Sequence, residues 1–163
     1  MRVCQLPGGE ATGKDPTNRA KLGTKRHLVV DRLGLPLAVT ISGANAHDSR
    51  LLEETVDAIP LLRLPHRQRG RPRKRPAKLH ADKGYDYPRC RRALRRRGII
   101  PRIARRGIDS SERLGRYRWV VERTLSWLNR FRRLKVRYER RAGIHHAFLT
   151  LGCALICGQT LTR

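Results

Sequence analysis

The sequence predicts an α/β domain in which helices cover a mixed sheet, and two observations lead to this class. Short apolar runs of strand character alternate with longer segments of helical period, in the order strand, strand, helix, strand, helix, strand, helix, helix. The chain has 163 residues, 39% of them hydrophobic, which suits one domain with a sizeable core. Each element of this order follows from a local pattern of residues.

The first two strands are expected to form an antiparallel hairpin. Residues 25–30 (KRHLVV) and 35–41 (LPLAVTI) contain apolar and β-branched side chains typical of strands, and the sequence between them, Asp31 to Gly34, is typical of a turn. Pro36 cannot donate a backbone hydrogen bond, so the second strand should lie at an edge of the sheet.

A helix over residues 50–59 should follow, because apolar residues recur there at helical spacing. Asp48 or Ser49 is its expected N-cap, and Pro60 ends it. Residues 64–76 are rich in arginine and proline and show no apolar period, so we expect an exposed basic loop.

A strand–helix–strand unit comes next. The apolar run over residues 77–81 predicts a short strand, and residues 99–103 predict another. Between them we expect a helix that Asp86 caps and that Gly98 ends.

Two helices complete the predicted fold, a long one over residues 114–134 and an apolar one over 143–161. The most apolar stretch, residues 147–157, is too short to cross a bilayer, so we expect it to cover the sheet. At 100° per residue, Glu122 falls off the core-facing stripe of the long helix. That stripe is predicted to consist of Tyr117, Val121, Thr124, Leu128 and Phe131.

The charge of the chain indicates its partner. Lys and Arg number 38 against 13 Asp and Glu, a formal charge of +25. A polyanion is therefore the expected ligand, nucleic acid first and an anionic membrane surface second. The cationic side chains expected to contact DNA phosphates are Lys83, Arg69, Arg71, Arg118, Arg123, Arg130 and Arg133.

Two acids stand out in this basic chain, and each has two interpretations. Asp82 follows a predicted strand and Glu122 lies in the middle of a predicted helix, where carboxylates could hold a divalent metal ion against a phosphate. Alternatively, Asp82 caps a local turn and Glu122 pairs with Arg118 one helical turn earlier. Spacing alone favours the second interpretation.

Several ordered blocks of the chain carry a resemblance. TGKDPTNRAKLGTKRHLVVDRLGLPLAV, ANAHDS, RGRPRKRPAKLHADKGYD, RGIIPRIARRG and RYRWVVERTLSWLNRFRRLKVRYERR together resemble bacterial insertion-sequence transposases of the DDE type. The group it is most similar to is the one named after insertion sequence five. The resemblance implies an RNase H-like catalytic domain.

The resemblance also implies a site. Members of this family use three carboxylates to hold two divalent ions, Mg²⁺ or Mn²⁺, for cleavage and strand transfer. Asp82 matches the second carboxylate and Glu122 the third, with Arg118 at the place of the family's arginine. Asn129 stands where the family often has a lysine, and Gly115 where it often has a tyrosine.

The sequence departs from the family pattern at the first carboxylate. It should lie at or just before residues 1–6, which contain no acid. We therefore expect residues 1–163 to be a partial catalytic domain, with its first strand truncated or missing. The gene would be truncated or read by frameshift, and the chain alone would perform little or no strand transfer.

The implied partners are DNA, at the element ends and the target, and either further copies of the chain or an upstream transposase peptide. No membrane partner is expected, and the implied location is the bacterial cytoplasm, with the nucleoid. The rival hypothesis is a basic nucleic-acid-binding protein without enzymatic activity, in which Asp82 and Glu122 have ordinary structural roles.

Overall fold

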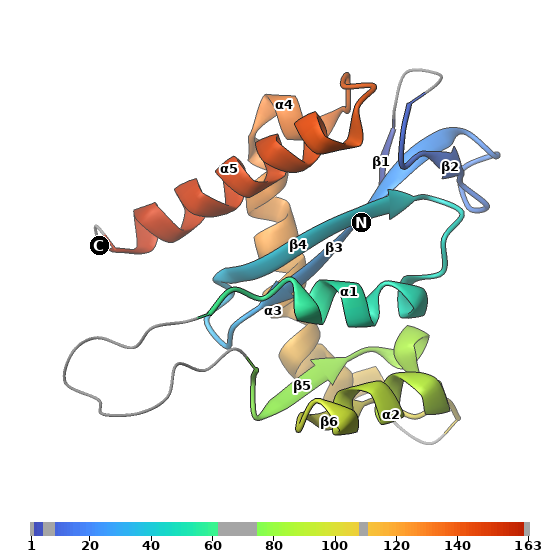
Figure 1. The fold of residues 1–163 in the computed structure, drawn as a ribbon, viewed down its shortest axis with the longest axis vertical. Coiled ribbons are helices and arrows are strands. Elements are labelled where there is room, and N and C mark those ends of the chain that lie inside the picture. The colour runs from blue at the N-terminus through green and yellow to red at the C-terminus, as the bar shows by residue number, and fades with distance from the viewer. Residues whose placement is uncertain (1, 5–8, 62–74, 108–110, 162–163) are drawn as a thin grey trace.

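The computed structural model describes residues 2–4, 9–61, 75–107 and 111–161, with side chains described for 9–61, 75–107 and 119–161. The described strands form two sheets, an antiparallel one and a parallel pair (Figure 1). The strands are β1 (Arg2–Cys4), β2 (Gly13–Lys14), β3 (Leu22–Val30), β4 (Pro36–Gly43), β5 (Lys78–Ala81) and β6 (Ile100–Ile103). The helices are η1 (Asp48–Arg50), α1 (Leu52–Asp57), η2 (Lys83–Tyr85), α2 (Pro88–Arg96), α3 (Ser111–Arg130), α4 (Arg132–Lys135) and α5 (Ala142–Leu161).

The antiparallel sheet is built around β3. β4 pairs with β3 as the predicted hairpin, in a register that runs from Thr24 opposite Gly43 to Val30 opposite Pro36. β1 and β2 pair with the first residues of β3. Among the described strands, β4 pairs only with β3, so Pro36 begins an edge strand as predicted. Both hairpin strands are longer than the sequence predicted.

The parallel pair consists of β5 and β6, joined through α2. Lys78 lies opposite Ile100 and Ala81 opposite Ile103, close to the predicted strands over 77–81 and 99–103. A parallel pair needs a crossover connection, and α2 supplies it. The α/β class is therefore confirmed, although the described strands of the expected mixed sheet are divided between two sheets.

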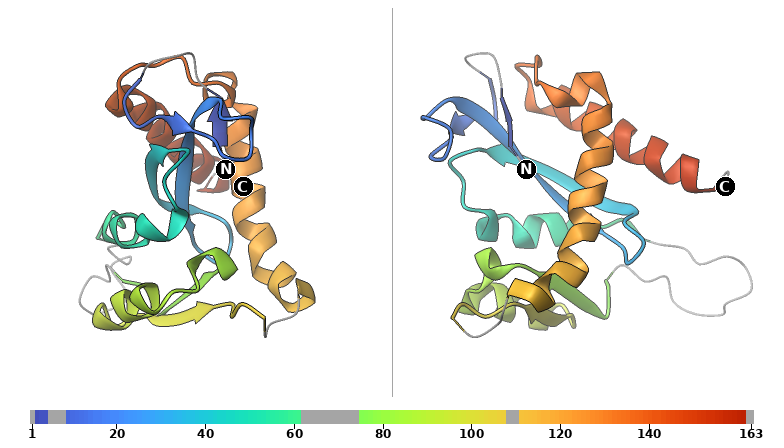
Figure 2. Two further views of the ribbon diagram at one scale, coloured as in Figure 1. Left: turned by 90° about the vertical axis from the view of Figure 1, so that its right-hand side faces the viewer. Right: turned by 180° about the vertical axis from the view of Figure 1, so that it is seen from behind.

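Helices cover both faces of the β3–β4 hairpin (Figure 2). Alternate residues of a strand point to opposite faces. Accordingly, Leu28 and Val39 pack in one core with α3 and α5, whereas Val29 and Ala38 pack in another with α1 and α2. The buried members of the first core are Val39, Leu128, Leu134, Leu149 and Ile156. Those of the second are Leu52, Val56, Ile59, Cys90, Leu94, Ile99 and Ile103.

The predicted helix over residues 50–59 is replaced by η1 and the shorter α1. The prediction that Asp48 or Ser49 caps it was wrong, because His47 is the N-cap of η1 and accepts from the amide of Ser49. Asp48 instead pairs with Lys25 at 2.8 Å. Ser49 is buried, and its hydroxyl bonds the His47 ring.

The helix between β5 and β6 also begins differently from the prediction. Tyr87, not Asp86, is the N-cap of α2, and its side chain makes no capping hydrogen bond. The Asp86 carboxylate accepts from the Arg91 guanidinium at 2.7 Å and from the Arg106 amide at 3.0 Å, so it is not available as a cap. Gly98, at φ +71°, follows the end of the helix as predicted.

The predicted long helix over residues 114–134 is divided into α3 and the short α4. The apolar helix predicted over 143–161 corresponds to α5, which packs Leu149 and Ile156 against the hairpin. Among the described residues, α5 is the one helix that is long and apolar enough to cross a membrane. It meets this criterion because the helix extends beyond the apolar run over residues 147–157. A core helix of a soluble protein meets the same criterion, and 28% of this segment is buried.

Candidate active site and nucleic-acid interface

Asp82 lies directly after β5, where the chain turns into η2. Its Oδ1 accepts a hydrogen bond from the amide of Gly84 at 2.9 Å, so the carboxylate caps this 3-10 turn. The side chain is exposed. The turn-capping role expected for an aspartate at a strand end is therefore present, and it places the carboxylate at the surface.

Glu122 lies in the middle of α3 and is exposed, as predicted from its position off the apolar stripe. Thr124 and Leu128 are buried as predicted. Val120 is buried in place of Val121, so the buried stripe is rotated slightly from the predicted one. The rotation leaves Glu122 at the surface.

The turn of the hairpin anchors α3. The Thr124 hydroxyl donates to the carbonyl oxygen of Gly34 at 2.7 Å, and Arg123 Nη2 donates to that of Leu33 at 2.5 Å. Gly34 has φ +88°, and a Cβ there would lie 2.8 Å from Arg123 Nη2. Only glycine fits this combination of backbone conformation and close approach. The two hydrogen bonds fix the position of the helix that carries Glu122.

Arg123 lies between two indole rings. Its guanidinium carbon is 4.5 Å from the Trp119 ring centroid and 4.7 Å from that of Trp127. Trp127 packs partly against the core, whereas Trp119 is 50% exposed. Arg123 thus has a structural role that the sequence did not indicate, and its contact with DNA stays a prediction.

The other predicted DNA-binding residues have different surroundings. Arg133 is exposed, pairs with the buried Glu139 at 3.0 Å and lies over the Tyr138 and Phe148 rings. Arg130 is exposed and Lys83 half-buried. Arg118 belongs to α3, but its side chain lies outside the described ones. Arg69 and Arg71, in the predicted basic loop, also lie outside the described residues.

Asn129, at the place of the family's lysine, contacts a buried cation. Its Oδ1 accepts from Arg26 Nη1 at 3.2 Å. Burial lowers the pKa of Arg26 to about 10. The amide of Asn129 therefore helps to solvate a charge inside the protein, in addition to any contact it makes with DNA.

The chemistry of the two acids suits a hard divalent cation, because Mg²⁺ and Mn²⁺ prefer carboxylate oxygens. The strand before Asp82 and the helix of Glu122 belong to parts of the fold that lie near one another in both figures. No group of three or more His, Cys, Asp or Glu that could hold a metal ion occurs within the described part of the chain. Those residues thus contain two candidate ligands and no cluster that would hold a metal by itself.

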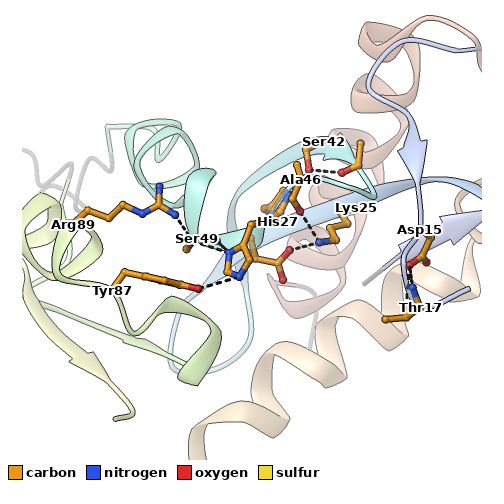
Figure 3. A network of polar contacts seen from close by, with 12 residues as sticks. Asp15, Thr17, Lys25, His27, Ser42, Ala46, Ser49, Tyr87 and Arg89 are labelled. Carbon is orange, nitrogen blue, oxygen red and sulfur yellow. Dashed lines mark hydrogen bonds and ion pairs between the residues drawn. The ribbon is translucent and has the colours of Figure 1, made fainter. Parts of the chain in front are cut away.

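A polar network that sequence reasoning missed joins η1 and its cap to the start of α2 (Figure 3). Arg89 Nη2 donates to the Ser49 hydroxyl at 2.5 Å, which also bonds His47 Nδ1 at 2.7 Å. His47 Nε2 lies 3.4 Å from the Tyr87 hydroxyl. The block ANAHDS contains His47 and Ser49, but nothing in its spacing indicated contacts with α2 across 40 positions.

A mixed α/β domain in a chain of charge +25 has the fold class and the charge of a protein that binds nucleic acid. The family model described as transposase DDE domain matches residues 1–157, and the chain belongs to this family.

The chain is also 54% identical over 156 residues to a protein of Burkholderia cepacia named "Putative transposase for insertion sequence element IS402". The match covers 96% of this chain and 72% of that protein. No solved structure matches the chain. The resemblance to DDE transposases is thereby confirmed, and the assignment to the group named after insertion sequence five stays a prediction.

Membership of this family supports two general conclusions about the chain. The chain is of the transposase kind, which acts on DNA, and the family uses divalent metal ions. The mixed α/β architecture with helices around small sheets is consistent with the RNase H-like fold of such domains.

Proposed function

We propose that Asp82 and Glu122 are two of the carboxylates of a metal-dependent site for phosphodiester cleavage and strand transfer in DNA transposition. The observation that supports this most is that Asp82 and Glu122, which the sequence resemblance assigns to the second and third carboxylates, are both exposed. The Thr124 and Arg123 hydrogen bonds to the hairpin turn support it further, because they hold the Glu122 helix in a fixed position.

Asp82 and Glu122 would each supply oxygen ligands to Mg²⁺ or Mn²⁺, two ions in the family's complete site. When bound, the ions stabilise the attacking and leaving oxygens of an in-line displacement at phosphorus. The chain's own contribution is to hold the carboxylates in position. Asp82 Oδ1 already receives the Gly84 amide at 2.9 Å, which orients its carboxylate.

The chain by itself is proposed to have little or no strand-transfer activity. Residues 1–6, where the family's first carboxylate is expected, contain no acid. The nearest acids in the sequence have other partners. Glu10 accepts from the Ala142 amide, and Asp15 is buried and accepts from the Thr17 amide. Further along the chain, Asp31 accepts from the Leu33 and Leu35 amides of the hairpin turn, and Asp48 pairs with Lys25. A transposase segment that carries the first aspartate is the proposed complement, and further copies of residues 1–163 would not supply that residue.

Metal titration tests the site without requiring activity. Mn²⁺ should raise the unfolding temperature of the wild type, since a ligand that binds only the folded state stabilises it. Glu122→Gln and Asp82→Asn should each abolish the increase. Glu54→Gln, at an exposed acid of α1, is the matched control and should retain it. An identical response of wild type and Glu122→Gln would refute the metal site.

Cleavage is tested separately. A labelled element end incubated with the chain and Mg²⁺ should stay intact, and robust cleavage would overturn the proposed inactivity. The alternative of a non-enzymatic DNA-binding protein is favoured by one observation, that Asp82 caps a turn like many structural aspartates. That alternative predicts DNA binding together with no difference between wild type and Glu122→Gln in the metal titration.

A further inference from the structure

Beside Asp82, five side chains from three separate segments form what we call the Tyr87 cluster (Figure 3 shows part of it). η1 and its cap supply two of them, the start of α2 supplies two, and the chain after β6 supplies the last. The members are His47, Ser49, Tyr87, Arg89 and Arg106.

Two guanidinium groups contact the Tyr87 ring. The Arg89 guanidinium carbon is 5.4 Å from the ring centroid, and that of Arg106 is 4.8 Å from it. Arg106 Nη2 also donates to the Tyr87 hydroxyl at 3.1 Å. His47 meets the ring edge-on with centroids 5.4 Å apart. The aromatic ring therefore holds two like charges close to each other.

Neutral acceptors, not carboxylates, orient both arginines. Arg89 donates to the Ser49 hydroxyl, and Arg106 Nε donates to the backbone carbonyl of Lys83 at 3.1 Å. The nearby Arg91 differs, because its guanidinium binds the Asp86 carboxylate at 2.7 Å. Asp86 accepts a hydrogen bond from the Arg106 backbone amide, and the charge of Arg106 acts on this carboxylate without a direct ion pair between the two side chains.

This arrangement leaves charge available. Both Arg89 and Arg106 are exposed, and within the described residues neither forms a side-chain ion pair. A guanidinium that is already oriented loses less conformational entropy when it binds, and its planar fork matches the oxygens of a phosphate. Two oriented arginines that form no direct ion pair within the described residues are thus suited to a phosphate of nucleic acid.

We propose that the Tyr87 cluster is a binding site for the phosphate backbone of DNA, next to the segment that carries Asp82. Arg106 holds the carbonyl of Lys83, the residue directly after Asp82, so a strand bound to the cluster lies beside that acid. The relation to cleavage rests on the proposed function, whereas the binding site itself does not.

Salt-dependent binding to a fluorescein-labelled 20-base-pair duplex, in EDTA, tests the cluster without the metal site. For Arg89→Ala/Arg106→Ala, the slope of log K against log salt should fall by roughly 1 to 2, since each lost phosphate contact removes about 0.9. The control is Arg92→Ala/Arg95→Ala, which removes the same charge from exposed positions of α2. Its slope should change by less than half as much, and equal changes in both variants would overturn the proposal.

A second pair of variants tests orientation and guards against loss of folding. Arg89→Lys/Arg106→Lys keeps the charge but removes the planar fork, and Tyr87→Phe removes the hydroxyl that accepts from Arg106. Both should bind the duplex several-fold more weakly than the wild type. Wild-type affinity in both would overturn the oriented site. Because EDTA removes the divalent ions, the duplex measurement does not depend on the metal site, and failure of the metal site and failure of the cluster are distinguishable.

Discussion

The Thr124 hydroxyl donates to the carbonyl oxygen of Gly34 at 2.7 Å, across 90 positions of the chain. Thr124 is fully buried, and the same hydroxyl also contacts the Val120 carbonyl at 3.1 Å. The helix that carries Glu122 is therefore tied to the hairpin turn through a buried bond that solvent cannot replace.

Removal of that bond should destabilise the fold. Thr124→Val keeps the shape but leaves the Gly34 carbonyl without its partner, and the expected loss in unfolding free energy is about 1–3 kcal/mol. Thr124→Ser keeps the hydroxyl and should restore the part of the loss due to the hydrogen bond. Denaturant unfolding measures both variants, and equal stabilities would contradict a role for the hydroxyl.

Gly34 should tolerate no side chain. Gly34→Ala forces φ +88° on an L-residue and brings Cβ within 3.0 Å of Thr124 Oγ1. Gly98→Ala is the matched control, because Gly98 also has positive φ but a Cβ added there would meet nothing within 4 Å. Backbone strain alone should make Gly98→Ala destabilising by about 1 kcal/mol. Gly34→Ala should destabilise the protein by at least about 2 kcal/mol, because the steric contact adds to the strain. Equal unfolding midpoints would refute the close packing.

Gly152 should behave similarly inside α5. A Cβ there would lie 2.9 Å from Leu134 Cδ1 and 3.2 Å from Leu128 Cδ2, so Gly152→Ala should destabilise by about 1–3 kcal/mol. Gly158→Ala, in the same helix and facing open space, should instead stabilise by up to about 1 kcal/mol. Thermal unfolding should shift in opposite directions for the two variants, and a common direction would contradict the packing of α5 on α3 and α4.

His27 should make the fold sensitive to acid. Burial is the main cause that lowers its pKa to about 4, from the ordinary 6.5. The unfolded chain then takes up a proton at higher pH than the folded one. The stability that neutral His27 provides is therefore complete above pH 6.5 and is lost as the pH falls towards 4.

His27→Asn should make the free energy of unfolding less dependent on pH by up to about 1.4 kcal/mol per pH unit between these limits. His145, whose pKa burial also lowers to about 4, provides a second, independent test by the same substitution. Denaturant unfolding at about pH 4.5 to 7 measures both variants. A slope unchanged from that of the wild type would exclude the lowered pKa at the residue concerned.

The sequence predicted elements best where local pattern determines them. The β3–β4 hairpin, the parallel strands and the apolar helix near the C-terminus all follow from apolar periodicity and turn residues. The helix starts were predicted poorly, because Asp48 and Asp86 look like caps but are bound to Lys25 and Arg91. A cap depends on which partner reaches the carboxylate, and these partners lie elsewhere in the fold.

The candidate site shows the same division. Exposure of Glu122 followed from helical periodicity, and the turn at Asp82 followed from residue type. The surroundings of Arg123 and the contacts of Tyr87 could not be predicted, because they join segments distant in the chain. Composition indicated a polyanion as partner, but it did not distinguish arginines with carboxylate partners from those without.

The described residues form two cores that share no buried residue, and this division has a consequence for how the protein unfolds. Units with separate cores can unfold separately at a lower free energy than the whole. We expect backbone amides of β5 and β6 to exchange with deuterium sooner than those in the centre of β3. DNA that binds both the Tyr87 cluster and α3 should slow exchange in β5 and β6 until it approaches that of β3. The two parts of the fold would then unfold together when DNA is bound.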